Sequence, residues 1–332
     1  MIEKTIIAEI KELTTLLIEN PFTQNEAKNY IDKIYAHFQI ITEISGYDLK
    51  IEYLAAIPAA TGKALGLNYA AQCLLDYKRT EKFLKAIILA IKEKRKEHPG
   101  ELINIFYAGC GPYAPFITLV APFFKSDEIQ FCLLEINKTS LESAKNLINS
   151  LELSNYVKEY YLADAVTFKI PNPDSFHMLI SETLDAILYR ECYVPILFNF
   201  LPQLNKNITL IPENVLLNLK LVTNHEKSSK CIEYEIDTIL NVHETVLSRT
   251  HSIAIPSQLS DKKINLKSLN IDSSKNILLD TQVHIYKNIW LNRNESSLTI
   301  PIEIKLKNPT QNNFIIFTYF MSPNVELKYR FE

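Results

Sequence analysis

Glycine is the residue in shortest supply in this sequence. Only 6 glycines occur in 332 residues, about 2% where roughly 7% is usual. All of them lie at or before position 111. Glycine serves where the backbone takes a positive φ angle or comes close to a ligand. In a chain that uses it so sparingly, Gly109 and Gly111, separated by one residue, indicate a turn with a specific purpose.

The sequence also lacks a surplus of either charge and a long apolar run. The 35 basic and 38 acidic residues leave a net charge of −3, whereas nucleic-acid-binding surfaces need a basic excess to neutralise phosphates. No apolar run reaches the ~20 residues of a membrane span. The start after Met1 is acidic and then amphipathic, unlike a signal sequence. We therefore expect a cytoplasmic protein that binds neither nucleic acid nor membrane.

Cysteines are few and show no pairing pattern. The five of them are odd in number and scattered over positions 73, 110, 132, 192 and 231. No two have metal-ligand spacing, and the sequence contains no His-Glu-x-x-His motif. This usage predicts a reduced protein without structural disulfides and without a metal centre.

The first hundred residues have the apolar periodicity of helices. Apolar residues recur at helical spacing over 6–17, and Pro21 ends that run. A capping-box pattern at 23–26 opens the next helix. A linker containing Pro58 follows, and 70–96 reads as one or two long helices. We divide this part into an N-terminal helical region, 1–60, and a second group of helices, 61–100.

From residue 101 to 212 strands and helices alternate. Short apolar strands are predicted at 102–107, 130–134, 157–162 and 177–180. An apolar helix is expected over 114–124, where Pro115 and Pro122 limit its extent, and a capping box at Thr139 opens another. Strands that alternate with helices are typical of a parallel sheet. The fold class is therefore α/β, with a Rossmann-like doubly wound sheet in this domain.

The residue pattern changes again over 213–332, a part that contains no glycine. Strands are predicted at 215–223, 231–236, 277–286, 298–307, 313–321 and 325–331. In 298–307, Ile300, Ile302 and Ile304 alternate with more polar residues, so they should share one face. We predict an antiparallel, barrel-like β domain, in which 258–275 could hold an insertion.

Acidic residues follow the glycine turn at successive strand ends. The turn Gly109-x-Gly111 between a strand and a helix presents backbone N–H groups to a ligand. Glu135 ends the second strand, where an acid can accept hydrogen bonds from ribose hydroxyls. Asp164 ends the third strand, where it could bind an adenine amino group or cap a helix.

Two carboxylates nine residues apart, Glu182 and Glu191, follow the fourth strand. With the leading Ser181 and the aromatic Tyr189, this segment resembles the double-glutamate loop of the protein arginine methyltransferases. It departs from that loop at Asp185, where the family usually has glycine. The resemblance extends by motif over roughly residues 69–220, while the first 60 residues match no family pattern.

The resemblance implies a class I methyltransferase with S-adenosyl-L-methionine as cofactor. Asp76-Tyr77-Lys78-Arg79-Thr80 is similar to the family's helix before the first strand, whose arginine binds the cofactor's carboxylate, so Arg79 takes that role. The helices of 61–100 would then pack on the cofactor site. The remaining implied cofactor-binding residues are Gly109, Cys110, Gly111, Glu135, Asp164 and Ala165.

Methyl transfer from a sulfonium needs mainly positioning and a suitable nucleophile. A guanidinium is planar and cationic, and two carboxylates can grip it and localise its charge away from the attacking nitrogen. We therefore interpret Glu182 as the principal clamp and Glu191 as the second. The expected acceptor is a guanidino nitrogen of a peptide, protein or small molecule. The proton could leave through a carboxylate or through water.

The family's Thr-His-Trp sequence, which lies in the β domain and lines the acceptor site, is absent. The only tryptophan, Trp290, has no adjacent histidine, and His284 reads as strand surface. No helical dimerisation arm is evident either. An acceptor thiol, hydroxyl or carboxylate therefore stays open, as does a catalytically silent partner subunit. The protein could form a homodimer or dock a partner through its N-terminal helices. A nicotinamide-dependent dehydrogenase would not need the two carboxylates.

Overall fold

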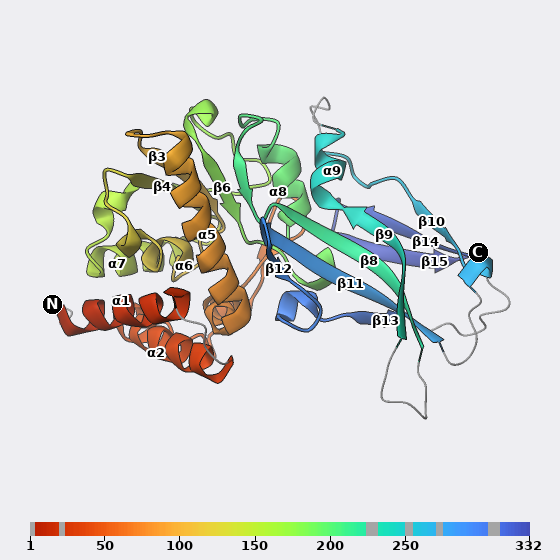
Figure 1. Cartoon of the computed structure of the whole chain (residues 1–332), viewed down its shortest axis with the longest axis horizontal. Helices are drawn as coiled ribbons and strands as arrows, with labels where there is room; N and C mark the ends of the chain where they lie inside the picture. Colours follow the sequence, from red (N-terminus) through yellow and green to blue (C-terminus); the bar gives the residue numbers. More distant parts are fainter. Residues whose placement is uncertain (1–3, 20–23, 224–231, 250–254, 270–274, 305–312) are drawn as a thin grey trace.

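The computed structural model describes the whole chain except residues 1–3, 20–23, 224–231, 250–254, 270–274 and 305–312. Along the long axis of the molecule, the parallel sheet with its helices occupies one half, with α1 and α2 below it in this view, and the antiparallel strands form the other half (Figure 1). No helix in the described ranges combines the length and apolar character needed to cross a bilayer.

The N-terminal part is helical, as predicted. Its elements are α1 (Lys4–Glu19), α2 (Gln24–Thr42), α3 (Ile51–Leu54), α4 (Leu67–Gln72) and α5 (Tyr77–Glu97), with a two-stranded hairpin of β1 (Ile57–Pro58) and β2 (Lys63–Ala64). Leu17 of α1 and Ile34 and Phe38 of α2 are fully buried, because the apolar faces of both helices face the core. Pro21 and the Thr23 cap lie outside the described residues.

A five-stranded parallel sheet forms the centre of the molecule. Its strands are β3 (Ile103–Ala108), β4 (Ile129–Glu135), β5 (Val157–Leu162), β6 (Met178–Ser181) and β7 (Thr209–Ile211), and the accompanying helices are α6 (Pro115–Thr118), α7 (Lys138–Ser150) and α8 (Tyr193–Phe200). The order β5-β4-β3-β6-β7 reverses between β3 and β6. This confirms the doubly wound sheet, and such a reversal is where open α/β sheets bind ligands.

The register of the sheet aligns the ends of three strands. Ala108 of β3 pairs with Leu134 of β4 and with Ser181 of β6. The next residues are Gly109, Glu135 and Glu182, and they leave the same edge of the sheet side by side. Parallel register therefore brings together residues that are up to 73 positions apart in sequence.

Successive residues of β3 anchor the two faces of the sheet. The Phe106 ring lies 5.2–6.3 Å from the ring centroids of Tyr161, Phe168, Phe176 and Phe200. On the opposite face, the Tyr107 ring lies 5.3 Å from Phe116 of α6, which in turn stacks on Phe83 of α5. Side chains alternate along a strand, so one strand contributes to the hydrophobic core on both sides of the sheet.

One local prediction in this domain, the start of its second helix, is wrong. The first helix, expected over 114–124 and limited by Pro115 and Pro122, consists of the four-residue α6 and a 3₁₀ turn at Ala121–Phe123, because Pro122 has no N–H to continue an α-helix. The N-cap of α7 is Asn137 rather than Thr139. The Asn137 side chain accepts hydrogen bonds from the backbone N–H groups of Thr139 and Ser140, which places Thr139 inside the first turn.

The C-terminal part is antiparallel, as predicted. One sheet contains β8 (Asn214–Thr223), β9 (Ile232–Asn241), β11 (Lys275–Tyr286), β12 (Ile289–Leu291) and β13 (Ile302–Ile304), and a second contains β10 (Lys262–Asn265), β14 (Phe314–Phe320) and β15 (Glu326–Phe331). A short helix, α9 (Val242–Leu247), follows β9. Apolar side chains from both sheets belong to the continuous core.

Two predictions for this part need correction. The strand expected over 298–307 is described only at β13, and the alternation is wrong: Ile300 and Ile302 are 55% and 41% exposed whereas Thr299 is buried. A 3₁₀ turn at Ser297–Thr299 replaces the first part of that strand. The stretch 258–275, considered as an insertion, contributes β10, which pairs with β14.

Helix α5 is fastened to the C-terminal strands by polar contacts. The Asp76 carboxylate accepts hydrogen bonds from both the backbone N–H (2.9 Å) and the hydroxyl (2.8 Å) of Ser297. The Lys82 ammonium lies 2.6 Å from the Glu295 carboxylate. These contacts bring the 297–302 segment close to the start of α5 and so complete one side of the site described below.

Phe106→Ala should lower the free energy of unfolding by about 3–5 kcal/mol, because it empties the centre of a four-ring cluster. Chemical denaturation measures the change. Tyr234→Ala, on the exposed side of β9, is the control and should change stability by less than about 0.5 kcal/mol. Equal losses in the two variants would contradict this account of the core.

Candidate active site

One cavity opens at the carboxyl ends of the parallel strands. Every site residue predicted from the sequence lines it: Arg79, Gly109, Cys110, Gly111, Glu135, Asp164, Ala165, Glu182 and Glu191. Residues of the β1–β2 hairpin also line it. The structure therefore brings the predicted residues together, while their individual roles stay predictions.

The two glycines of the turn meet different surroundings. Gly109 and Gly111 have φ angles of +73° and +65°, in the region that favours glycine. A Cβ atom on Gly109 would lie 2.4 Å from Cγ2 of Thr183, whereas one on Gly111 would meet no atom within 4 Å. Gly109 thus lets β3 approach the segment after β6 closely, and Gly111 leaves open space beside the cavity.

The Glu135 carboxylate is held by backbone donors on both oxygens. Oε2 accepts from the Gly111 N–H at 2.8 Å, and Oε1 accepts from the Asn137 N–H at 2.9 Å. Burial raises the pKa of Glu135, and these donors oppose that rise. Each carboxylate oxygen has two lone pairs, so both can accept a further hydrogen bond from a ligand in the cavity.

Asp164 also uses both carboxylate oxygens. Oδ1 accepts from the Val166 N–H at 2.8 Å and so caps its own turn. Oδ2 accepts from the Ala60 N–H of the hairpin at 2.6 Å. The residues described directly after Asp164 form a turn and not a helix, so Asp164 caps that turn rather than the helix considered from the sequence. Its bond to Ala60 adds a tie to the hairpin that the sequence did not indicate.

A buried ion pair joins the two sides of the cavity. The Arg79 Nη2 atom of α5 lies 2.9 Å from Glu182 Oε2, and the side chains are only 7% and 9% exposed. The other oxygen, Glu182 Oε1, is buried and has no hydrogen-bond partner among the described residues. A buried carboxylate oxygen without a donor is unfavourable, so this atom marks a place where a ligand can donate.

Both glutamates have raised pKa values. Burial raises the pKa of Glu182 to about 7, against the opposing charge of Arg79. Burial, followed by the charges of Glu182 and Asp185, raises the pKa of Glu191 to about 8. Burial lowers the pKa of Arg79, but Glu182, Cys73 and Asp76 together outweigh burial and raise that pKa. A cation in the cavity would favour the ionised form of both glutamates.

The loop between the two glutamates contains left-handed backbone without glycine. Ile187 and Leu188 both have φ angles of +55°, a conformation that costs an aliphatic residue about 1–3 kcal/mol. Two contacts with the C-terminal strands hold it: the Ile187 N–H donates to Thr281 Oγ1 at 2.8 Å, and the Tyr319 hydroxyl donates to the Leu188 carbonyl at 3.0 Å.

Asp185, which stands where the related loop usually has glycine, has a structural role here. Its backbone is extended, with φ −118°, so the position does not need glycine. The Asp185 Oδ1 atom accepts from the Tyr189 N–H at 2.8 Å and from the Arg190 N–H at 3.2 Å. The departure from the family pattern therefore supplies a cap for the loop.

A second cavity adjoins the first and shares with it Leu65, Cys73, Arg79, Glu182 and Glu191. Its remaining wall includes Tyr69, Asp76, Asp185, Tyr189, Ser297, Leu298, Ile300 and Ile302. Of these, Tyr69, Ser297 and Leu298 were not singled out from the sequence, because they belong to no motif. Both glutamates line both cavities.

The residues considered in place of the absent Thr-His-Trp sequence lie elsewhere. His284 pairs with Trp290 across β11 and β12, and their rings stack at 3.9 Å. Neither residue lines either of the two cavities. The C-terminal residues that do line the second cavity, Ser297 to Ile302, offer hydroxyl and aliphatic groups instead.

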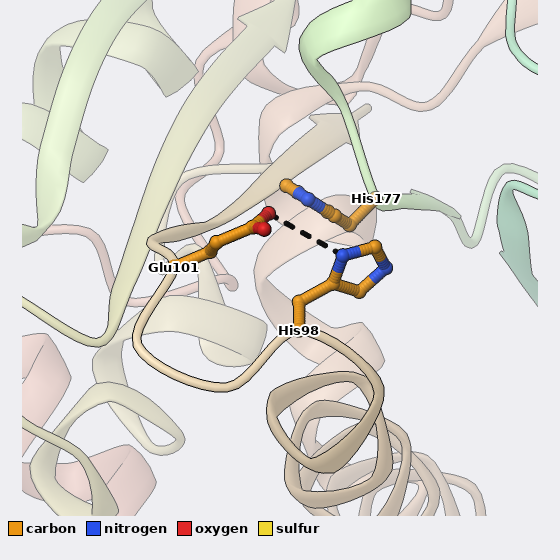
Figure 2. Close-up of side chains that lie close together, drawn as sticks. All are labelled: His98, Glu101 and His177. Atoms are coloured by element: carbon orange, nitrogen blue, oxygen red, sulfur yellow. Dashed lines mark ion pairs between the residues drawn. The ribbon is translucent and has the colours of Figure 1, made fainter.

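A group of possible metal ligands, His98, Glu101 and His177, lies at the opposite edge of the parallel sheet, before β3 and β6 (Figure 2). Glu101 pairs with His98 Nδ1 at 3.4 Å. The Asn104 N–H donates to His177 Nδ1 at 3.1 Å, which assigns the imidazole proton to Nε2 and leaves no free nitrogen lone pair for a cation. The four described cysteines are free thiols, and Cys231 lies outside the described residues.

No family model matches the chain, and no curated protein matches its sequence. Among solved structures, the chain is similar to the Trypanosoma brucei PRMT1 enzyme-prozyme heterotetrameric complex with AdoHcy, with 10% sequence identity and a TM-score of 0.46. The match covers 78% of this chain and 96% of that chain. This likeness concerns the fold alone.

Gly109→Ala should destabilise the protein more than Gly111→Ala. Both changes force a left-handed alanine, which costs about 1–2 kcal/mol, but only the first also meets Thr183. We expect an extra loss of about 1 kcal/mol in unfolding free energy for Gly109→Ala. In urea denaturation, Thr183→Ser, which removes Cγ2, should abolish that excess. If Gly109→Ala still loses more unfolding free energy than Gly111→Ala in the Thr183→Ser background, the contact with Thr183 is not the cause.

Proposed function

We propose that the protein is an S-adenosylmethionine-dependent methyltransferase that transfers a methyl group to a guanidino nitrogen. The observation that carries this proposal is the pair of glutamates shared by two cavities at the switch point of the sheet. One cavity is then the cofactor side and the other the acceptor side. Methyl transfer needs two adjoining spaces of this kind, because the acceptor nitrogen must reach the methyl carbon directly and in line, at about 3–3.5 Å.

The residues of the first cavity fit the proposed cofactor. The open space at Gly111 allows a ligand to approach the backbone. Glu135 has spare lone pairs for ribose hydroxyls, and Arg79 offers a buried cation for the amino-acid carboxylate. Asp164 and Ala165 line the same cavity for the adenine end. S-adenosylmethionine, when bound, supplies a sulfonium-activated methyl group.

The two glutamates would hold and activate the acceptor. Glu182 Oε1 is free to accept from a guanidinium N–H, and Glu191 lines the same cavity as a second acceptor. Paired carboxylates draw the positive charge toward the bound nitrogens, which leaves the remaining nitrogen more nucleophilic. In the transfer, a carbon–nitrogen bond forms as the carbon–sulfur bond breaks, and the nitrogen loses one proton to a glutamate or to water.

Glu182→Gln should reduce kcat/KM for methyl transfer by at least about 100-fold, because the clamp loses its charge. Cofactor affinity, measured by calorimetry, should be unchanged or higher, because Arg79 loses its competing partner. Glu142→Gln on the exposed surface of α7 is the matched control and should change neither quantity. A parallel loss of cofactor affinity and transfer would contradict the assigned role.

The rate should rise with pH. Raised carboxyl pKa values mean that Glu182 and Glu191 are protonated below their pKa values of about 7 and about 8, and a protonated clamp does not attract a cation. A guanidinium stays charged throughout this range. We therefore expect kcat/KM to increase from pH 6 to pH 9. Glu191→Gln should remove the part of this increase that follows ionisation of Glu191, near pH 8. A profile that is flat or that falls over this range would be inconsistent with the proposal.

The acceptor atom is tested by mass localisation. The protein is incubated with isotope-labelled S-adenosylmethionine and with guanidino, thiol, hydroxyl and carboxylate acceptors, and the labelled methyl group is located. We expect label on a guanidino nitrogen. Label on sulfur or oxygen would replace the guanidino acceptor with one of the other chemistries, and absence of cofactor binding would indicate a catalytically silent subunit.

A further inference from the structure

Large apolar side chains gather at the mouth of the second cavity, beside the exposed Arg190 and Ser297. Four large apolar side chains that line it are also exposed: Tyr69 (53%), Tyr189 (46%), Ile300 (55%) and Ile302 (41%). They come from α4, from the loop between the two glutamates and from the region of β13. Scattered exposed apolar side chains are ordinary, but a group gathered at one opening indicates a binding surface.

The inner part of the same cavity is acidic. Glu182 and Glu191 line it, and Glu182 Oε1 lacks a donor among the described residues. The two basic side chains on its wall are already paired, Arg79 with Glu182 and Arg190 with Asp185. A ligand that suits this cavity therefore carries a cationic end for the interior and an apolar group for the mouth.

Further exposed apolar side chains stand on the segment next to α4. Tyr47, Leu49 and Ile51 are 63%, 91% and 80% exposed. Their segment is held against α4 by two hydrogen bonds of 2.6 Å, from Asn68 Nδ2 to the Asp48 carbonyl and from Gln72 Nε2 to the Gly46 carbonyl. Tyr69 belongs to the same helix, so α4 carries one of the side chains at the mouth of the cavity and also holds this second group of exposed apolar residues.

We propose that the methyl acceptor is a polypeptide in which the modified cationic residue is flanked by large apolar residues. The inference rests on the proposed function. The cationic side chain would enter between the glutamates, while its apolar neighbours pack on Tyr69, Tyr189, Ile300 and Ile302 and remove that surface from water. A glycine-flanked arginine would leave these apolar side chains uncovered.

The test compares three probes at equal concentration with labelled S-adenosylmethionine. Two are peptide pools with one fixed arginine, flanked either by leucine, isoleucine and phenylalanine or by glycine and serine. The third is agmatine, a free guanidino amine. We expect kcat/KM for the apolar pool to exceed that of each other probe by about tenfold or more.

Variants of the mouth connect this preference to the named residues. The double variant Ile300→Ser with Ile302→Ser, and separately Tyr69→Ser, should reduce the preference to less than about threefold, with cofactor affinity unchanged by calorimetry. Leu247→Ser, an exposed position on α9 outside both cavities, is the matched control and should keep the full preference.

The outcomes separate the two proposals. Equal methylation of both pools, faster methylation of agmatine, or a preference that survives the mouth variants overturns the apolar-flank inference and leaves the methyltransferase intact. If the protein binds the cofactor but methylates none of the three probes, the guanidino acceptor itself is wrong, and the inference falls with it.

Discussion

The buried ion pair between Arg79 and Glu182 is the contact around which the site is organised. It joins the first turn of α5 to the end of β6 at 2.9 Å in surroundings almost free of solvent. Removing one member of such a pair strands a buried charge and typically costs about 3–5 kcal/mol. In the proposed chemistry Arg79 binds the cofactor's carboxylate and Glu182 binds the acceptor's guanidinium. Each ligand must therefore bring a charge that replaces the partner lost when the ion pair opens.

The pair can occupy this position because the sheet reverses its order at β3 and β6. That reversal opens a crevice into which helices before and after the strands can extend side chains. Arg79 comes from a helix that precedes the sheet, and Glu191 from the loop between β6 and α8. The ends of the strands supply the rest, so residues spread over more than a hundred positions of sequence line two adjoining cavities.

Much of this arrangement was predictable from local sequence. Strand ends followed by Gly109, Glu135 and Glu182 predict a shared edge, since parallel strands carry their carboxyl ends to the same side. The second cavity was not predictable, because Tyr69, Ser297 and Leu298 reach it through tertiary contacts that leave no signal in the sequence. The alternation over 298–307 suggested a strand, yet the Ser296 and Thr299 side chains form a capping box that turns the chain instead.

The left-handed pair Ile187 and Leu188 bears on how this chain could have evolved. Their backbone is held from outside the parallel sheet, by Thr281 of β11 and Tyr319 of β14. An ancestor reduced to the sheet and its helices would have kept a place for the cofactor, but its loop could relax to an ordinary backbone and move the glutamates apart. An exchange of C-terminal halves between related chains would therefore preserve the loop only where both of these hydroxyl partners, one accepting and one donating, are present.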